Sequence, residues 1–352
     1  MSKYWNDTVK NLQPYVPGEQ PKDMKYIKLN TNESPYPPSP KVLEAISKGN
    51  NGTLKLYPDP NVDDLRKTVA KYYNIDKDEV FVGNGSDEVL AFSFMTFFSS
   101  EKKVLFPDIT YSFYKVYAKL LNLQTEIIPL DEEFNIPIEK LCRNIGGVVL
   151  ANPNAPTSKA IAVGDIKKIL DSNKDNVVIV DEAYIDFGGT SVVSLIKDYD
   201  NLLVVQTLSK SRALAGLRVG FAFGSKELIE GLNRLKNSIN SYTIDRIAIE
   251  GAIAAFEDET YFKELTSKII KTREETIENL RNIGFKVMDS KSNFVFVSHE
   301  KVNAEELFKS LRKNGILVRY FNEPRINNFL RITIGTDEEM KILIEVLKNI
   351  LN

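Results

Sequence analysis

Short runs of apolar residues recur along the first two thirds of the chain, and stretches with helical spacing separate them. Examples are VLFP at 104–107, VVL at 148–150, VVIV at 177–180 and LLVV at 202–205. Such runs are apolar on both faces, which is typical of strands buried between two layers of helices. The alternation therefore predicts an α/β fold built on a mainly parallel sheet.

The chain divides into three segments. Prolines are frequent near the N-terminus, in PYVPGEQP and NTNESPYPPSP, and they prevent long regular elements there. We expect an extended N-terminal arm at 1–30 and the large α/β domain at 31–245. A long amphipathic stretch begins near residue 246, and FKVMDS, NFVFVS, AEELFKSLRKNG, GILVRYF and FLRITIG follow it. This pattern predicts a smaller C-terminal α+β domain at 246–352.

Composition excludes several classes of protein. Apolar residues make up 43% of the chain and charged residues 27%, and the net charge is -2. These values are ordinary for a globular protein and give no general attraction to nucleic acid or to anionic membranes. No apolar run is long enough for a membrane span, and the N-terminus lacks the apolar core of a signal peptide. We therefore expect a cytoplasmic protein.

The chain has one cysteine, Cys142, and one histidine, His299. A single cysteine excludes an intramolecular disulfide and a cysteine zinc cluster, so we expect no metal and interpret Cys142 as a small buried residue. His299 follows a strand-like run, where we expect a solvated turn. Acid and base catalysis would therefore depend on lysine, tyrosine, carboxylates or a cofactor.

Polar residues follow several of the predicted strands, where open α/β sheets bind their ligands. In VGNGSDEVL, a glycine-rich turn enters a helix at Gly85 and Ser86, and its backbone N–H groups could bind a phosphate. A simple capped helix fits this motif equally well. Asp181 follows VVIV, and a carboxylate there is costly unless a cation pairs with it. Tyr184 would point into the same crevice, although an N-cap aspartate and a core tyrosine fit as well.

The segment TLSKSRALAGLR, 207–218, places Lys210 and Arg218 just after a buried strand. A phosphate site, a desolvated carboxylate and a lysine that can form a Schiff base suit pyridoxal 5'-phosphate. A lysine aldolase or a phosphate-binding sugar enzyme could use a similar set.

VVIVDEAYIDF and TLSKSRALAGLR resemble the fold-type I pyridoxal-phosphate aminotransferases, and more closely the histidinol-phosphate aminotransferases among them. The resemblance extends over the whole chain and includes PYVPGEQP, KLNTNESPYPPSP, LYPDP, GNGSDE, TYSFY, GILVR and LRITIGT. It implies a large domain with a seven-stranded sheet.

The resemblance also implies roles for individual residues. Lys210 would bind the cofactor as a Schiff base and act as the base that moves the substrate proton. Asp181 would keep the pyridine nitrogen protonated, Tyr184 would bond the ring oxygen, and Tyr111 would stack on the ring. The cofactor phosphate would be bound by Gly85, Ser86, Ser209, Arg218 and Tyr57. Tyr57, in LYPDP, would come from the neighbouring subunit of a homodimer.

For the substrate, the resemblance implies that Arg331 clamps a carboxylate or phosphate and that Arg319 binds the distal carboxylate of glutamate. Tyr15 of the arm would donate to the substrate phosphate. The predicted reaction is transamination between L-histidinol phosphate and 2-oxoglutarate in histidine biosynthesis. An aromatic amino-acid aminotransferase, a threonine-phosphate decarboxylase and a phosphate-binding protein without catalysis are the alternatives.

One position departs from the family pattern. The family has PNNPTG where this chain has PNAPTS at 153–158, so the asparagine expected to bond the ring oxygen is Ala155. Either Tyr184 makes this contact alone or Asn154 compensates through a bent turn. Arg212 receives no role and is interpreted as a surface or subunit contact.

Overall fold

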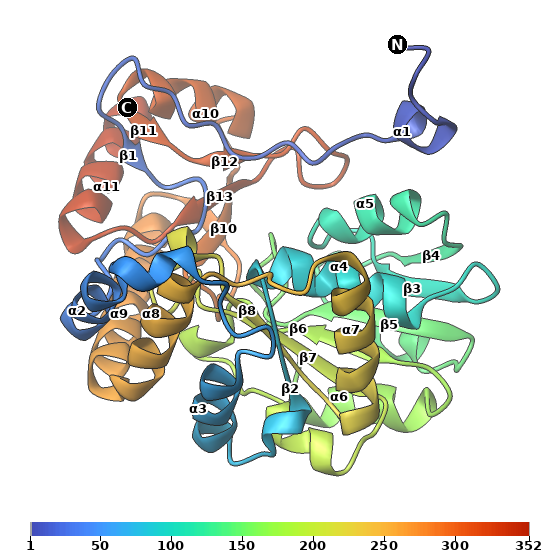
Figure 1. Cartoon of the computed structure of the whole chain (residues 1–352). Helices are drawn as coiled ribbons and strands as arrows, with labels where there is room; N and C mark the ends of the chain where they lie inside the picture. Colours follow the sequence, from blue (N-terminus) through green and yellow to red (C-terminus); the bar gives the residue numbers. More distant parts are fainter. Residues whose placement is uncertain (1, 352) are drawn as a thin grey trace.

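A seven-stranded sheet forms the centre of the larger part of the computed structural model, which describes residues 2–351 (Figure 1). The strand order is β2-β8-β7-β6-β5-β3-β4. β8 runs antiparallel to both of its neighbours and the remaining pairs are parallel, which confirms the predicted mainly parallel sheet. The strands are β2 (Val80–Gly83), β3 (Lys103–Pro107), β4 (Thr125–Ile128), β5 (Gly146–Ala151), β6 (Val178–Asp181), β7 (Leu202–Thr207) and β8 (Gly220–Phe223).

Helices cover both faces of this sheet. Val178 and Val180 of β6 belong to the core under α3 (Asp63–Tyr73), α6 (Val163–Ser172) and α8 (Arg246–Glu257). Ile179, between them, faces the opposite core under α4 (Gly85–Phe97), α5 (Phe113–Leu120) and α7 (Lys226–Ile239). Each central strand is therefore apolar on both sides, which is why its sequence lacks the polar alternation of a half-exposed strand.

The smaller part of the chain contains a four-stranded antiparallel sheet in the order β12-β13-β10-β9. Its strands are β9 (Phe285–Val287), β10 (Phe294–His299), β12 (Arg319–Tyr320) and β13 (Leu330–Thr333). Three helices accompany it: α9 (Glu259–Asn282), α10 (Ala304–Lys313) and α11 (Asp337–Leu351). Thr336 and Glu339 form a capping box at the start of α11, since each side chain accepts a hydrogen bond from the backbone N–H of the other.

The N-terminal arm begins with the short helix α1 (Asp7–Asn11) and crosses the top of Figure 1 to the smaller part. There β1 (Ile27–Lys28) pairs in parallel with β11 (Ile316–Leu317). α2 (Pro40–Gly49) then packs against α8. The single-turn helices are η1 (Gly52–Lys55), η2 (Lys77–Glu79), η3 (Ile138–Leu141), η4 (Ile185–Phe187), η5 (Val193–Lys197) and η6 (Ala215–Leu217).

The predicted domain boundary at residue 246 coincides with the first residue of α8. Ala248 and Ala252 of α8 belong to the core of the seven-stranded sheet, whereas Leu265 and Ile269 of α9 belong to the core of the smaller part. The packing therefore changes between the two helices. The division of the chain into domains stays a prediction.

His299 does not lie on a solvated turn, as the sequence led us to expect. It is the last residue of β10, is 7% exposed, and packs against the Phe285 ring with centroids 4.9 Å apart. Its Nδ1 accepts a hydrogen bond from the backbone N–H of Lys301 at 3.2 Å. Cys142 is partly buried beside the core of the seven-stranded sheet.

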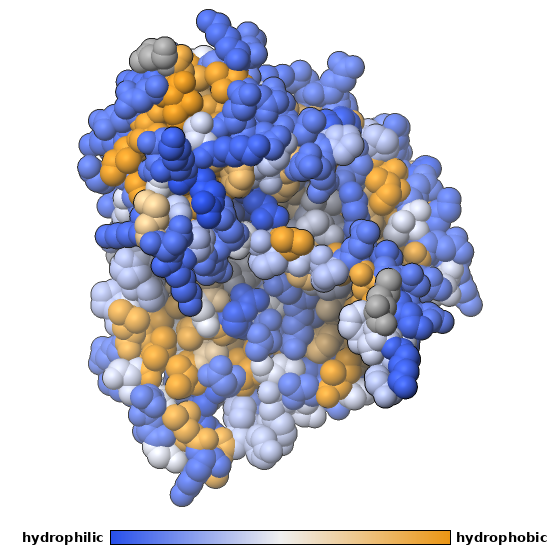
Figure 2. Space-filling model, turned by 90° about the horizontal axis from the view of Figure 1, so that it is seen from above, coloured by the Kyte–Doolittle hydropathy of each residue, from blue (hydrophilic) through white to orange (hydrophobic). Residues whose placement is uncertain are grey.

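Hydrophobic residues form separate groups on a largely hydrophilic face when the molecule is seen from above (Figure 2). Every helix between residues 2 and 351 is too short or too polar to span a lipid bilayer.

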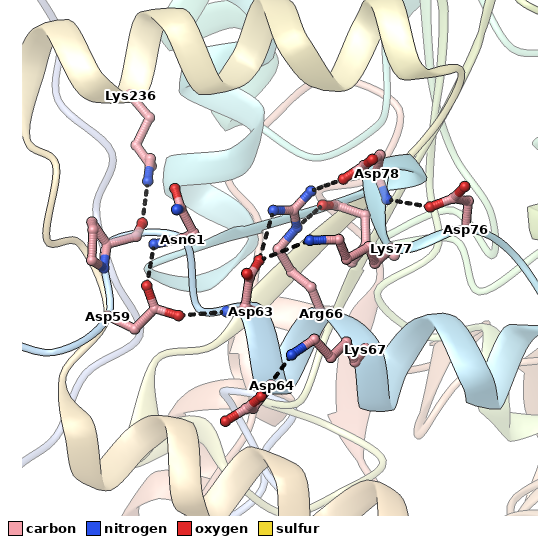
Figure 3. Close-up of polar contacts among 12 residues, drawn as sticks. Asp59, Asn61, Asp63, Asp64, Arg66, Lys67, Asp76, Lys77, Asp78 and Lys236 are labelled. Carbon is pink, nitrogen blue, oxygen red and sulfur yellow. Dashed lines mark hydrogen bonds and ion pairs between the residues drawn. The ribbon is translucent and has the colours of Figure 1, made fainter.

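Figure 3 shows a polar network that joins α3 to the start of β2. Arg66 Nε donates to the Val80 carbonyl at 3.0 Å, and its other nitrogens pair with Asp78 at 3.1 Å and Asp63 at 3.4 Å. Asp59 Oδ2 accepts a hydrogen bond at 2.8 Å from the backbone N–H of Asp63, the first residue of α3, and Asp59 Oδ1 accepts one at 3.0 Å from that of Asn61. The network fixes the loop that precedes α3.

We expect Arg66→Met to lower the free energy of unfolding by about 1–3 kcal/mol, because the Val80 carbonyl and two carboxylates lose a common donor. The Arg66 side chain is 12% exposed, whereas that of its neighbour Lys67, paired only with Asp64, is 58% exposed. The matched control Lys67→Met should therefore change the stability by no more than about 0.5 kcal/mol. Urea unfolding of both variants measures the difference, and equal effects would contradict the prediction.

Candidate active site

A cavity of about 230 Å³ lies at the carboxyl ends of β5, β6 and β7, between the arm and the smaller part of the chain. It is lined by ten of the twelve residues that the sequence analysis selected: Tyr15, Ser86, Tyr111, Asp181, Tyr184, Ser209, Lys210, Arg218, Arg319 and Arg331. Gly85 lies beside it, next to Arg218. Tyr57 does not line this cavity.

Asp181 is the last residue of β6 and is 5% exposed. Tyr114 Oη donates to Oδ2 at 2.8 Å, and the backbone N–H of Ala183 donates to Oδ1 at 3.1 Å. Burial raises the pKa of Asp181 to about 6, although both hydrogen bonds act in the opposite direction. Within the described chain, no lysine or arginine forms an ion pair with Asp181. A cationic ligand group would supply the missing charge.

Lys210 follows β7, and its Nζ lies 3.3 Å from the Thr31 carbonyl oxygen and 5.9 Å from the centroid of the Tyr184 ring. Burial and, to a lesser extent, the positive charge of Arg331 lower the pKa of Lys210 to about 8. The neutral amine is therefore much more populated near neutral pH than for an ordinary lysine, and it predominates above about pH 8. This is the form in which lysine attacks a carbonyl carbon.

Two arginines of the smaller part face the cavity. Arg331 donates from Nη2 to the Asn30 carbonyl at 3.0 Å, while its buried Nε has no hydrogen-bond partner among residues 2–351. Arg319 donates from Nη2 to the Val16 carbonyl at 3.1 Å. Neither takes part in an ion pair between described residues. A buried guanidinium nitrogen without a partner, such as Arg331 Nε, suits a ligand that carries carboxylate or phosphate groups.

Close packing brings Arg218 next to the start of α4, where the sequence predicts a phosphate site. Gly85 has φ 78°, and a Cβ there would lie 2.4 Å from Arg218 Nη2. A Cβ at Gly220 would lie 2.5 Å from the Ser86 nitrogen. Glycine at both positions thus keeps Arg218 and the N-terminus of α4 close together, where an anion is favoured.

Asp87 stands at the same helix terminus, and the sequence analysis did not select it. Its Oδ1 accepts a hydrogen bond from Tyr111 Oη at 2.7 Å, and its Oδ2 pairs with Arg218 at 3.4 Å. Asp87 therefore orients both Tyr111, which is predicted to stack on the cofactor ring, and Arg218, which is predicted to bind the cofactor phosphate.

Asn154 does not compensate for Ala155. Its Nδ2 donates to the Ile109 carbonyl and to Thr157 Oγ1, both at 2.9 Å, and its Oδ1 accepts from Thr110 at 2.7 Å. The amide is thus fully used by Thr157 of its own loop and by Ile109 and Thr110, which follow β3. Ala155 lines the cavity with a methyl group.

The interpretation of Arg212 as a surface contact is wrong. The residue is 7% exposed, and its guanidinium carbon lies 4.1 Å from the Phe262 ring centroid and 4.3 Å from that of Phe256. Its Nη1 donates to the Ala255 carbonyl of α8. Arg212 therefore anchors the loop that follows Lys210, with its charge stacked on aromatic rings.

Two further residues, Asn32 and Tyr114, contact the predicted catalytic residues but were missed. Asn32 Nδ2 donates to Tyr184 Oη at 3.0 Å, across 152 residues of chain. Tyr114 reaches Asp181 from α5. Their motifs, NTNES and TYSFY, were noticed in the sequence, but no spacing rule connects them to Tyr184 or Asp181.

Comparison with known proteins gives consistent results. The profile of the family described as aminotransferase class I and II matches residues 24–347. A histidinol-phosphate aminotransferase of Clostridium acetobutylicum is 67% identical over 348 residues, which cover 99% of each chain. One of Clostridium beijerinckii is 62% identical over 352 residues, covering 100% of this chain and 98% of the relative.

A crystal structure of histidinol-phosphate aminotransferase from Sinorhizobium meliloti in complex with pyridoxal-5'-phosphate superposes with a TM-score of 0.90. It covers 100% of this chain and 98% of its own, at 23% sequence identity. This likeness confirms the fold.

We expect Tyr114→Phe to raise the dissociation constant for pyridoxal 5'-phosphate about tenfold at pH 7, because a hydrogen bond to a charged group contributes about 1.5–3 kcal/mol. Losing this bond moves the pKa of Asp181 further upward, so the loss of affinity should grow as the pH falls from about 8 to about 6. Titration of the apoprotein with the cofactor measures it.

The matched control is Tyr117→Phe on the same helix, since Tyr117 Oη donates to the Asp87 backbone carbonyl instead. A cofactor affinity that changes equally in both variants would contradict the role assigned to the Tyr114 hydroxyl.

Proposed function

The chain belongs to the class I and II aminotransferase family, and we propose that it transfers the amino group of L-histidinol phosphate to 2-oxoglutarate. The products would be imidazole-acetol phosphate and L-glutamate, and the cofactor would be pyridoxal 5'-phosphate. The observation that carries this proposal is the 67% identity to a histidinol-phosphate aminotransferase along 99% of both chains. The cavity supports it because Lys210, Asp181 and three arginines line it together.

The residues around the cavity fit pyridoxal 5'-phosphate. When bound, this cofactor supplies an aldehyde for a lysine amine and a ring that accepts electron density from the substrate. Lys210 would hold the aldehyde carbon, and the buried Asp181 carboxylate would bind the protonated ring nitrogen. Arg218 and the backbone of Gly85 and Ser86 would bind the phosphate, at the glycine positions where a Cβ would collide.

Proton transfer would depend on Lys210 Nζ. Because burial lowers the pKa of this amine to about 8, it can accept a proton from the substrate's α-carbon near neutral pH and release it again. Tyr111 would cover one face of the ring, since Asp87 holds its hydroxyl at 2.7 Å. Ser209 accepts a hydrogen bond from Thr207 Oγ1 at 2.9 Å and would direct its own hydroxyl hydrogen to the cofactor phosphate.

The two substrates would share the anion site. Arg331, with its unpartnered Nε, would bind the phosphate of histidinol phosphate or the α-carboxylate of glutamate. Arg319 would bind the distal carboxylate. Tyr15 lies at the rim, with its ring centroid 4.5 Å from that of Phe113, and would donate to the substrate phosphate.

We further propose a cytoplasmic homodimer in which Tyr57 contributes to the partner's cavity. Tyr57 is 78% exposed and stacks on Tyr242 with ring centroids 4.5 Å apart, and the nearby Leu54 and Leu56 are also exposed. Exposed aromatic and aliphatic side chains in one segment are typical of a subunit interface.

Purified protein supplied with pyridoxal 5'-phosphate should show a visible absorption band near ~420 nm, which borohydride removes. Lys210→Ala should lack the band, whereas Lys115→Ala, whose amine donates to the Asp108 carbonyl outside this cavity, should keep it. We expect kcat/KM with 2-oxoglutarate to be at least about tenfold higher for histidinol phosphate than for phenylalanine or tyrosine. Equal values would exclude the proposed substrate, and a missing band in the unmodified chain would exclude the cofactor.

Mixing two inactive variants tests the shared site. In a hybrid of Tyr57→Ala and Lys210→Ala subunits, one cavity would combine an intact Lys210 with the partner's intact Tyr57. Random exchange should then restore about a quarter of the normal activity, because about half of the dimers are hybrids with one complete site each. Activity that stays at the sum of the separate variants would show that Tyr57 does not act across the interface.

A further inference from the structure

The hydrogen bonds around Asn32 have a defined direction. The backbone N–H of Asn32 donates to Thr333 Oγ1 at 3.0 Å, and the Thr333 hydroxyl donates to Asn32 Oδ1, also at 3.0 Å. Since Oδ1 is the acceptor, Nδ2 is the group that faces Tyr184 Oη, at 3.0 Å. Both polar atoms of the Asn32 side chain then have a hydrogen-bond partner.

The position of Asn32 is itself fixed. The residue is 1% exposed and has φ 57°, a conformation that asparagine tolerates better than most residues. Its carbonyl accepts a hydrogen bond from Asn293 Nδ2 at 3.0 Å. Asn32 is therefore held by Thr333 and by Asn293, and its side-chain amide has little freedom to rotate.

Tyr184 is fixed in turn. Its ring lies edge-on to Phe294 with centroids 5.0 Å apart, and its hydroxyl receives the hydrogen of Asn32 Nδ2. A hydroxyl that accepts from one side must place its own hydrogen elsewhere. Tyr184 lines the cavity together with Ala155, which offers no donor.

We propose that Asn32 is a positioning residue that fixes the direction of the Tyr184 hydroxyl, so that its hydrogen is donated into the cavity, to the ring oxygen of the cofactor. This inference rests on the proposed function, because it requires pyridoxal 5'-phosphate in the cavity. Tyr184, oriented by Asn32, would then be the side chain that donates a hydrogen bond to the ring oxygen, because the neighbouring Ala155 has no donor.

Burial raises the pKa of Tyr184, so the hydroxyl keeps its hydrogen at neutral pH, although Arg331 and Asn32 act in the opposite direction. A donor at the ring oxygen stabilises negative charge there. Losing this donor makes the proton shared by that oxygen and the Lys210 nitrogen harder to remove. The visible band of the bound cofactor should then titrate at higher pH.

The test is Asn32→Asp in the holoenzyme. Aspartate keeps the shape and tolerates the positive φ, but its carboxylate accepts where the amide donated, so it draws the Tyr184 hydrogen away from the cavity. We expect the titration midpoint of the visible band to rise by about 0.5–1 pH unit, the equivalent of one hydrogen bond. Asn32→Gly also tolerates the backbone angle and removes the amide, so it should give a smaller rise.

The matched control for the added charge is Asn30→Asp. Asn30 lines the same cavity, but its Nδ2 donates to the Glu19 carbonyl at 2.9 Å and not to Tyr184. We expect a clearly smaller shift in this variant. Equal shifts for the two aspartate variants would mean that charge alone is responsible and would overturn the proposal.

A double-mutant cycle gives a second criterion. Tyr184→Phe should raise the midpoint, and adding Asn32→Gly to it should have no further effect. Additive shifts would overturn the role of Asn32, while thermal unfolding of each holoenzyme confirms that it is folded. If the unmodified protein bound no cofactor, the proposed function itself would fail, which is distinguishable from a normal band that Asn32 variants leave unchanged.

Discussion

Asp181 is buried and Lys210 and Arg331 are partly buried around one cavity, and none of the three forms an ion pair within residues 2–351. Burying a charge without a counterion costs free energy, so the rest of the fold must supply that energy. The strands that carry Asp181 and Lys210 are packed on both faces, which holds these residues in place without relying on contacts between them. A ligand whose charges are opposite to these uncompensated charges can pair with them.

The pKa shifts of Asp181 and Lys210 reflect the same free-energy cost of burying a charged group. The pKa of Asp181 is raised to about 6 in the folded state, from about 4 in the unfolded state. Protonation of this carboxyl therefore stabilises the fold fully below about pH 4, and this stabilisation is lost as the pH rises through 6. The pKa of Lys210 is lowered to about 8, so its burial also costs stability at neutral pH. At pH 7 both groups therefore destabilise the folded protein when no ligand is bound. A ligand that pairs with them therefore stabilises the fold as it binds.

The sequence predicts those parts of the site that adjoin an apolar run. Asp181 and Lys210 were identified because each follows a strand, and sheet topology brings strand ends together. Asn32 and Tyr114 were missed because their partners lie 152 and 67 residues away along the chain, and only the tertiary fold brings them together. Arg212 was misread because it falls where the resemblance to the family is loosest, whereas aromatic rings of α8 and α9 lie against it.

The hydrogen bonds of Asn32 connect three segments that lie far apart in the sequence. Thr333 belongs to β13 of the smaller part, Tyr184 follows β6 of the large sheet, and Asn32 lies in the segment between β1 and α2. Arg331 stands two residues before Thr333 on β13, so any displacement of that strand would move the proposed anion-binding guanidinium and the support of Tyr184 together. The proposed substrate binding at Arg331 and the proposed hydrogen donation by Tyr184 would therefore depend on one shared element, even though the two side chains have separate chemical roles.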